Sequence, residues 1–246
     1  MNGLAGKNAL VTGASRGLGK GIALGLADNG VNVVVNYRQH HKAAEDTVGE
    51  ILGKGRRAMA QCADVREWPQ VRTMVTNIIN EWGRIDFLIN NVGDFIYKEF
   101  DKLDVKDWHA MLDSNLNSCF YCCKAVLPFM RKQNFGRIIN IGLGNAGNHA
   151  FIHVLPYAIA KTGVHILSKS LALNEAAHGI TVNVVAPGLM NNGSLDDEQV
   201  RQQSRMVPMN RPGTADDLAG AVLYLLSDAA GYVTGTEILV SGGWGL

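Results

Sequence analysis

The sequence contains no long hydrophobic run and carries almost no net charge. None of its apolar stretches approaches the roughly 18–20 residues that a transmembrane helix requires. Its 23 Lys and Arg residues nearly balance 22 Asp and Glu residues, for a formal charge of +1. We also expect no signal peptide, because only five residues separate Lys7 from Gly13 and they are typical of a strand. We therefore expect a soluble cytoplasmic protein with no nucleic-acid and no membrane partner.

Cysteine is scarce, with four residues in the chain. Cys119 and Cys122 form a C-x-x-C pair, but within an apolar helical run, SCFYCCKAVLPFM, and not after the strand and turn that precede a redox pair. We expect these two residues, Cys62 and Cys123 to be reduced, buried and structural. No metal site is expected.

Glycine, in contrast, is abundant, with 28 residues, and short apolar runs typical of strands alternate with segments of helical periodicity. The 246 residues, 47% of them hydrophobic, suffice for one large α/β domain. Alternation of strands with amphipathic helices predicts βαβ units and a parallel sheet with right-handed crossovers. The predicted strands are 9–12, 31–36, 57–62, 86–90 and 137–141, and the predicted helices near the amino terminus include 42–52 and 68–82.

A glycine-rich turn, TGASRGLG, follows the first predicted strand and begins a helix in which Leu18, Ile22 and Leu26 recur at helical spacing. Glycines at such a turn let backbone N–H groups approach a diphosphate at the positive end of a helix. The spacing G-x-x-x-G-x-G meets the common dinucleotide fingerprint only loosely. The turn predicts a nucleotide site; the alternative is a tight turn without a ligand.

The second predicted strand ends at Asn36, where an NAD enzyme would place an acidic residue for the ribose 2′-hydroxyl. Arg38 lies just beyond, and Arg16 lies in the glycine turn. Two guanidinium groups without a carboxylate suit a 2′-phosphate, which favours NADP(H). For Arg38 alone, the alternative is a solvated surface charge.

Ligands of parallel sheets bind beyond the carboxyl ends of the strands. Gly13, Arg38, Asp64, Asn91 and the 142–153 loop all follow strand ends in this sequence. We therefore expect them to converge on one rim of the sheet.

Tyr157 and Lys161 lie four residues apart in a predicted helix over 155–177, so their side chains share one helix face. A phenol with a pKa near 10 is a poor acid or base at neutral pH, and a nearby ammonium favours its ionised form. Such a Tyr can exchange a proton with a carbonyl or alcohol oxygen. Taken alone, the pair could also be two partly exposed helix residues.

Together these segments resemble the short-chain dehydrogenase/reductase family over nearly the whole chain, and most closely its 3-oxoacyl-[acyl-carrier-protein] reductase branch. The resemblance implies one doubly wound Rossmann-type α/β domain over residues 1–246, with a seven-stranded parallel sheet in the order 3-2-1-4-5-6-7 and helices on both faces. The motifs that carry it are Thr12-Gly13-x-x-x-Gly17-x-Gly19, Asp64-Val65, Asn90-Asn91-x-Gly93, Asn115, Tyr157-x-x-x-Lys161 and Pro187-Gly188.

The resemblance also implies residue roles. Tyr157 would be the proton donor in carbonyl reduction, Lys161 would lower its pKa and bond the nicotinamide ribose, and Asn115 would hold a water of a proton relay. Asp64, Val65 and Asn91 would surround the adenosine, and Met190 would lie by the nicotinamide. The implied cofactor-binding residues are Thr12, Gly13, Ser15, Arg16, Gly17, Leu18, Gly19, Arg38, Asp64, Val65, Asn91, Gly93, Tyr157, Lys161, Pro187, Gly188 and Met190.

One residue of the family pattern is missing. A catalytic Ser usually follows the fifth strand. Counting from that strand gives Leu143 at its position, and counting back from Tyr157 gives Gly144. No Ser lies anywhere between Ile141 and Tyr157. Losing such an oxygen-binding donor costs on the order of 10²–10³ in turnover in another enzyme class. Three interpretations remain open: His149 or His153 replaces the Ser, the substrate is a pterin-type C=N compound that does not need it, or the chain binds NADP(H) without catalysis.

The segment over about 189–212 is polar and predicts a mobile substrate lid. Asn192 occupies the position of a family Thr that bonds the nicotinamide carboxamide. The lid's polarity favours a small or polar substrate. The resemblance further implies that two long helices, 107–132 and 155–177, pair across two-fold axes in a homotetramer. The predicted function is NADP(H)-dependent reduction of a carbonyl, in a 3-oxoacyl thioester or a small ketone, with Tyr157 as proton donor.

Overall fold

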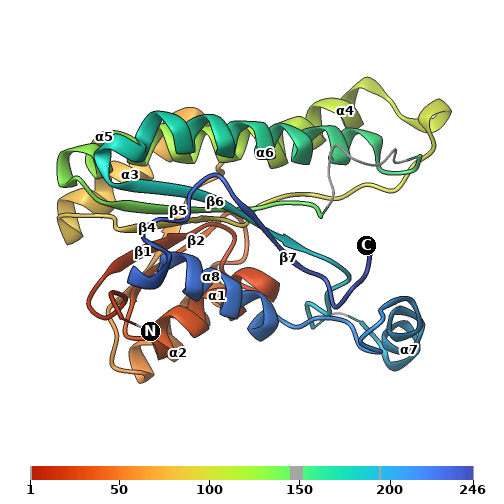
Figure 1. Cartoon of the computed structure of the whole chain (residues 1–246), viewed down its shortest axis with the longest axis horizontal. Helices are drawn as coiled ribbons and strands as arrows, with labels where there is room; N and C mark the ends of the chain where they lie inside the picture. Colours follow the sequence, from red (N-terminus) through yellow and green to blue (C-terminus); the bar gives the residue numbers. More distant parts are fainter. Residues whose placement is uncertain (1, 145–151, 194, 246) are drawn as a thin grey trace.

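The computed structural model describes residues 2–144, 152–193 and 195–245 of the chain. Seven parallel strands form one sheet in the order β3-β2-β1-β4-β5-β6-β7, with helices on both faces (Figure 1). The predicted fold class and strand order are therefore confirmed. The strands are β1 (Asn8–Val11), β2 (Asn32–Tyr37), β3 (Ala58–Cys62), β4 (Phe87–Asn90), β5 (Gly136–Ile141), β6 (Ile180–Pro187) and β7 (Glu237–Val240).

The sheet separates two hydrophobic layers, which explains why its central strands are apolar on both faces. Every residue of β1, β4 and β5 is buried. A strand covered by helices on both sides needs a continuous apolar run and not an alternating one. This is why the sequence predicts the positions of these strands to within a residue or two.

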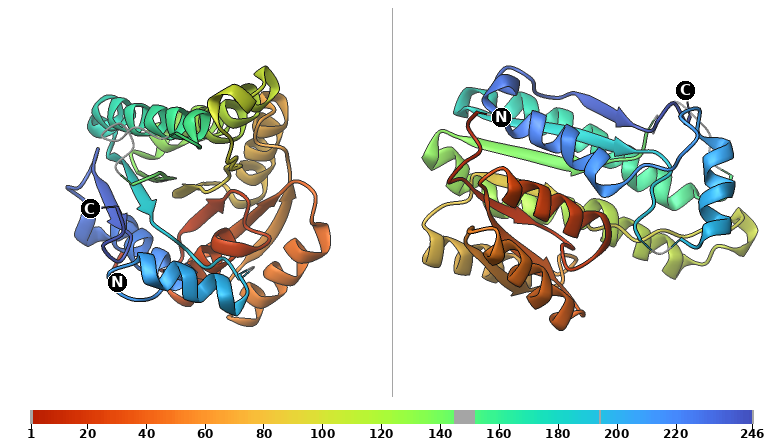
Figure 2. Two further views of the ribbon diagram at one scale, coloured as in Figure 1. Left: turned by 90° about the vertical axis from the view of Figure 1, so that its right-hand side faces the viewer. Right: turned by 90° about the horizontal axis from the view of Figure 1, so that it is seen from below.

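Helices in two groups cover the two faces of the sheet (Figure 1, Figure 2). The first group packs on one apolar cluster and the second group on another, and alternate residues of β1, β2, β4 and β5 contribute to each cluster. The first group is α1 (Gly17–Asp28), α2 (His41–Gly53) and α8 (Ala215–Leu226), and the second is α3 (Trp68–Trp82), α5 (Ser118–Gln133) and α6 (Leu155–Glu175).

The predicted long helix over 107–132 is not uniform. It consists of α4 (Val105–Leu112), a π-helical turn over Asp113–Asn117, and α5. A π turn holds one extra residue, which here places Asn115 in the interior, where it is 1% exposed. The predicted helix over 155–177 matches α6 and the 3₁₀ turn that follows it, Ala176–His178.

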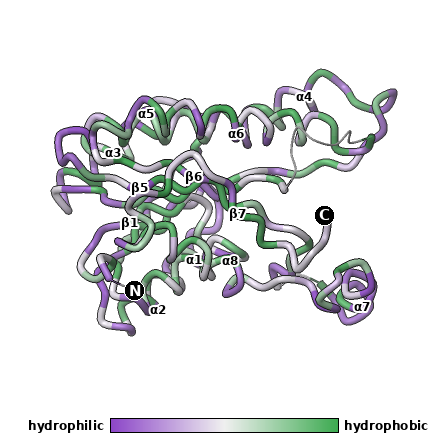
Figure 3. Tube along the Cα trace, viewed as in Figure 1, coloured by the Kyte–Doolittle hydropathy of each residue, from purple (hydrophilic) through white to green (hydrophobic). Residues whose placement is uncertain are grey.

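The predicted lid region contains α7 (Asp197–Met206), which extends away from the sheet beyond its carboxyl edge (Figure 1, Figure 2). A capping box between Asp196 and Gln199 begins the helix. None of the residues of α7 is buried, and its surface is largely hydrophilic (Figure 3). The helix is therefore stabilised by local contacts and not by packing on the core.

The prediction that all four cysteines are buried is wrong for one of them. Cys119, Cys122 and Cys123 are buried on α5, but Cys62 is exposed at the end of β3, an edge strand. Burial raises the pKa of the Cys122 thiol well above its usual range, so this group is inert near neutral pH. In the part of the chain that the structure describes, no helix is long and apolar enough to cross a membrane.

Candidate active site

The carboxyl ends of the strands bring most of the predicted site residues to one rim. A groove of about 670 Å³ lies between the glycine turn and the residues that follow β4, and a second hollow of about 160 Å³ adjoins it beside Arg38. The groove is lined by Gly13, Arg16, Gly17, Leu18, Gly19, Asn91, Val92, Gly93, Asn192 and Gly193. The hollow is lined in part by Ser15, Arg16, Arg38, Asp64 and Val65.

The glycine turn has the geometry that a diphosphate site requires. Gly13 and Gly17 have φ angles of +62° and +59°, in the left-handed region that favours glycine. A Cβ on Gly19 would lie 2.4 Å from the carbonyl oxygen of Gly13. The turn therefore packs tightly against the start of α1. The amino-terminal end of this helix lines the groove, and free N–H groups at such an end favour an anion. These residues fit a dinucleotide diphosphate.

Asn36 supports this turn and also lines the hollow beside Arg38. It is 1% exposed, and its Oδ1 accepts a hydrogen bond from the N–H of Gly13 at 3.3 Å. Its Nδ2 donates to the carbonyl oxygens of Ala63 and Gln61, at 3.1 and 3.2 Å. The side chain of Asn36 therefore also ties the turn to the end of β3, a role that the sequence did not predict.

Thr12 and Asn91 likewise hold the turn in place. The Thr12 hydroxyl accepts from the N–H groups of Asn91 and Val92, at 2.9 and 3.2 Å. The Asn91 Nδ2 donates to the carbonyl oxygen of Thr12 at 3.0 Å. These bonds join the ends of β1 and β4, so both residues shape the groove, and Asn91 also lines it.

The hollow beside Arg38 has a positive and a negative side. Arg66 binds Asp64 through Nη2 at 2.6 Å and Nε at 2.9 Å, and this bonding holds the pKa of the Asp64 carboxyl below its usual range. Arg38 approaches the same carboxylate only to 3.7 Å, and its side chain is 40% exposed. Arg66 is therefore the main partner of Asp64, whereas Arg38, which also lines the hollow, forms only a longer ion pair with it. Sequence reasoning missed Arg66.

Tyr157 and Lys161 lie on α6, and Lys161 contacts the last residue of β5. The Nζ of Lys161 donates to the carbonyl oxygen of Ile141 at 2.7 Å and lies 5.7 Å from the centre of the Tyr157 ring. Burial raises the pKa of Tyr157 to about 12 and lowers the pKa of Lys161 to about 8. The expected lowering of the Tyr157 pKa by Lys161 is not found in this structure, where burial is the cause of the shift. A phenol that stays protonated is the form a proton donor needs.

Asn115 and Gly93 complete this cluster. The Nδ2 of Asn115 donates to the carbonyl oxygens of Asp94 and Met111, at 2.9 and 3.1 Å. Its Oδ1 is buried and has no hydrogen-bond partner within the described chain. A Cβ on Gly93 would lie 2.3 Å from that Oδ1 and 3.2 Å from Lys161 Nζ. The free acceptor thus points to the space beside Lys161, where a water would satisfy it.

The segment in which we expect the family Ser to be missing is partly described. Leu143 and Gly144 are half-buried, and a Cβ on Gly144 would lie 2.4 Å from Cδ1 of Leu239. Below them, the Nε2 of buried His165 would lie 2.8 Å from a Cβ on Gly142. The Nδ1 of the same ring is 3.4 Å from the Glu237 carboxylate. His165 therefore fills the space under this segment, which sequence reasoning did not anticipate.

Of the two histidines considered as substitutes for the Ser, the structure describes only His153. His149 lies outside the described residues. His153 stacks on Tyr97 with ring centres 4.7 Å apart. Phe95, two residues before Tyr97, meets the Tyr157 ring edge-on at 5.2 Å. The structure therefore brings His153 into the aromatic surroundings of Tyr157. Sequence reasoning missed Phe95 and Tyr97, although two aromatics directly after N-N-V-G-D were a readable signal.

The residues after β6 lie against the other side of the groove. Pro187 ends β6, and Gly188 donates to the Val240 carbonyl oxygen at 3.0 Å. Met190 pairs with Gly213 in an isolated bridge, so it joins the two ends of the lid segment. A Cβ on Gly17 would lie 3.8 Å from Cβ of Asn192. Asn192 therefore lies near the glycine turn, at the predicted diphosphate position.

Comparison with known proteins gives a consistent assignment. A family model described as Enoyl-(Acyl carrier protein) reductase matches residues 13–245. A 3-oxoacyl-[acyl-carrier-protein] reductase of Synechocystis sp. is 39% identical over 249 residues, covering 99% of this chain and 98% of that protein. The 3-oxoacyl-[acyl-carrier-protein] reductase of Staphylococcus aureus is also 39% identical, covering 96% of this chain and 97% of its own.

The same similarity holds in three dimensions. A crystal structure from Sinorhizobium meliloti 1021, of a protein provisionally described as a short-chain alcohol dehydrogenase, superimposes with a TM-score of 0.91 at 33% identity. The match covers 98% of this chain and 96% of that one. Sequence and fold therefore agree on the family over almost the full length.

Proposed function

The chain belongs to the short-chain dehydrogenase/reductase family of oxidoreductases, and on that premise we propose that it is an NADP(H)-dependent reductase of a carbonyl group. The observation that carries this proposal is the convergence of Gly93, Asn115 and Lys161 beside Tyr157. A buried amide oxygen without a partner is unfavourable in a purely structural site. It has a use where a water must sit beside a buried lysine.

The chain's own groups account for the proton side of the reaction. Tyr157 is protonated at neutral pH, because burial raises its pKa to about 12, and it donates its proton to the substrate oxygen. NADPH, held in the groove between the glycine turn and Gly93, would supply the hydride. Lys161 carries a charge below pH 8, so it stabilises the phenolate that Tyr157 leaves. A water held by the Oδ1 of Asn115 then returns a proton through Lys161.

The preference for NADP(H) rests on the hollow beside Arg38. Arg16 and Arg38 both line it, and Arg66 is the main partner of the Asp64 carboxylate. A 2′-phosphate would face two guanidinium groups, whereas a ribose 2′-hydroxyl would find no carboxylate on β2. We therefore expect the affinity for NADPH to exceed that for NADH.

A second candidate is reduction of a C=N bond in a pterin-type substrate. It is favoured by Leu143 and Gly144, which offer no side-chain donor where the family Ser stands. A carbonyl oxygen gains more from such a donor than a ring nitrogen that Tyr157 protonates directly. Loss of one donor is a handicap on the order of 10²–10³ for oxyanion-forming reactions, so this candidate explains the missing Ser without a loss of rate.

We also propose that the chain assembles as a homotetramer through α5 and α6. Ile159, Ile166 and Leu173 of α6 are exposed, and their spacing of seven residues places them on one face of the helix. The outer surface of α5 borders an apolar hollow of about 580 Å³ lined in part by Phe120 and Leu127. Two-fold pairing would cover both surfaces. Light scattering of the purified protein gives the mass that tests this.

The test of the function is NADPH oxidation against acetoacetyl thioester, simple diketones, a sugar ketone and a dihydropterin, with NADPH binding followed by fluorescence. We expect turnover of at least one compound, and Tyr157→Phe should abolish it while leaving NADPH binding near normal. Arg38→Ala should weaken NADPH binding far more than NADH binding. Tight NADPH binding without turnover of any compound would contradict the proposal and indicate a cofactor-binding relative without catalysis.

A further inference from the structure

An exposed aromatic ring lies directly beside the proposed proton donor. The Phe95 ring centre is 5.2 Å from that of Tyr157, and the two planes are nearly perpendicular, at 79°. Phe95 is nevertheless 63% exposed. Its edge-to-face contact with Tyr157 therefore uses only part of the ring, and much of its remaining surface is open to solvent next to the phenol.

A second ring continues this surface. Tyr97 stacks on His153 with ring centres 4.7 Å apart and an angle of 25°, and it is 66% exposed. The N–H of Lys98 donates to the His153 carbonyl oxygen at 2.7 Å, which fixes the strand-like segment against the start of α6. Residues 95 and 97 both contact the 153–157 segment, as alternate residues of an extended chain do. We call these two rings, Phe95 and Tyr97, the aromatic wall, because both lie against the 153–157 segment.

Charges near the aromatic wall do not favour an anionic substrate. The segment 94–107 holds five carboxylates and three lysines. Lys98 is bound to Asp107 and Lys102 to Glu99, each at 2.6 Å. A thioester on a phosphopantetheine arm brings a phosphate, which cations would have to recognise. Here two of the three nearby lysines are already paired, and the segment as a whole is negative.

We propose that the site reduces a C=O or C=N bond belonging to a planar conjugated ring, which the aromatic wall holds by stacking beside Tyr157. The inference rests on the proposed function. Exposed rings gain from covering by a flat partner, because stacked and edge-on arrangements are favourable and remove apolar surface from water. The hydride of NADPH adds to the ring carbon and the proton of Tyr157 to the oxygen or nitrogen, so that NADPH becomes NADP⁺ and the double bond is reduced.

Stacking also gives the missing Ser an explanation. A ring gripped by its faces is oriented without a hydroxyl on its reacting atom, whereas an acyclic ketone depends on donors at its oxygen. Leu143, at the position of the Ser by counting from β5, is half-buried and apolar. An apolar side chain there suits the surface of a ring better than it suits a single polar oxygen.

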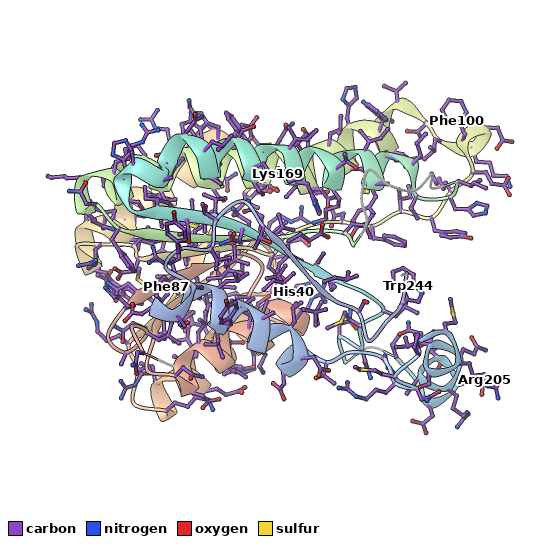
Figure 4. The ribbon with its side chains drawn as sticks, in the orientation of Figure 1. His40, Phe87, Phe100, Lys169, Arg205 and Trp244 are labelled. Carbon is purple, nitrogen blue, oxygen red and sulfur yellow. The ribbon has the colours of Figure 1, made fainter. Side chains whose placement is uncertain are left out.

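The test compares flat and acyclic substrates on matched variants. The probes are phenanthrenequinone and a dihydropterin as rings, and ethyl acetoacetate and acetoacetyl-N-acetylcysteamine as acyclic ketones. Phe95→Leu and Tyr97→Leu keep an apolar side chain but remove the ring. Phe100→Leu is the control, because Phe100 is 74% exposed and lies at the outer end of the segment that follows β4 (Figure 4).

We expect wild-type protein to prefer a ring over both acyclic ketones by at least 10-fold in kcat/KM. Phe95→Leu and Tyr97→Leu should each raise KM for the ring at least 5-fold, with less than 2-fold change for an acyclic ketone and none for Phe100→Leu. An equal effect on both substrate types would overturn the inference. Equal or better turnover of the acyclic ketones by wild-type protein would overturn it too, yet leave the reductase function standing.

Binding separates failure of this inference from failure of the function. Fluorescence of the dihydropterin is titrated with protein saturated with NADP⁺. Binding by wild-type protein that Phe95→Leu weakens at least 5-fold supports a ring site even where no turnover is detected, and would then contradict the reductase function alone. Absence of ring binding to wild-type protein contradicts the inference. Thermal unfolding and NADPH binding of each variant confirm that it is folded.

Discussion

Gly93 and Asn115 are so close that no side chain fits between them: a Cβ on Gly93 would lie 2.3 Å from Oδ1 of Asn115. The glycine is required by this approach and not by its backbone angle, which lies outside the left-handed region. The same Cβ would be 3.2 Å from Lys161 Nζ. The close approach thus holds together groups from three elements, the end of β4, the π turn and α6.

Gly93→Ala should therefore reduce kcat at least 10-fold, because the added methyl displaces the amide oxygen and the ammonium that we assign to the proton relay. Steady-state kinetics with the best substrate measures the effect. Gly49→Ala is the matched control, since a Cβ at this helical position meets nothing within 4 Å and should leave kcat unchanged. Wild-type kcat in Gly93→Ala would show that Asn115 and Lys161 are not needed in their present positions.

Lys161 should make the reaction sensitive to pH near 8. Burial lowers its pKa from 10.5 to about 8, so the ammonium is present below pH 8 and lost above it. The pKa of Tyr157, about 12, lies too high to titrate in this range. We expect kcat/KM for reduction to fall as the pH rises through about 8, and Lys161→Arg to retain less activity but lose this fall. A flat profile from pH 7 to 9.5 would contradict the assignment.

The lowered pKa of Lys161 also affects the stability of the fold, which should rise with pH where kcat/KM falls. Between pH 8 and 10.5 the unfolded chain binds a proton at Lys161 that the folded chain has released, so this residue makes stability rise with pH in that window. Lys161→Met removes this contribution. Thermal unfolding of both proteins without added NADPH measures this effect. The melting temperature of Lys161→Met should exceed that of the wild type at pH 7, and this excess should be smaller at pH 9.5.

How much of this site could be predicted depends on which interactions are local in sequence. Five of the strands and the shared helix face of Tyr157 and Lys161 were predictable, because buried parallel strands leave continuous apolar runs and helical spacing leaves a periodic pattern. The strand order followed from the resemblance to the family. The inward position of Asn115 was not predictable, since one of the carbonyl oxygens that its Nδ2 binds, that of Asp94, lies 21 residues away. Nor was the role of Asn36, whose partners lie about 25 residues away on either side.

The position of the missing Ser can be resolved by substitution. Leu143→Ser should raise kcat for an acyclic ketone about 10-fold or more, because it restores a donor where the count from β5 places it. Gly144→Ser should raise it less, since its Cβ would lie 2.4 Å from Cδ1 of Leu239 and this side chain must first move aside. Kinetics and thermal unfolding distinguish the two. A gain from Gly144→Ser alone would show that the count from Tyr157 is the correct one.

Asn36 provides a test of the groove that does not involve catalysis. Asn36→Asp would place an acidic residue on β2, as in NAD enzymes, but here its second oxygen would face the carbonyl oxygens of Ala63 and Gln61 that now accept from Nδ2. Losing two buried hydrogen bonds and adding a buried charge should destabilise the fold by about 1–3 kcal/mol, and the displaced Gly13 turn should weaken NADPH and NADH alike. Arg38→Asp is the matched change at an exposed side chain, and it should shift the preference from NADPH to NADH with little change in melting temperature. If Asn36→Asp instead gains NADH affinity at an unchanged melting temperature, Asn36 faces the ribose, and its role in supporting the turn is wrong.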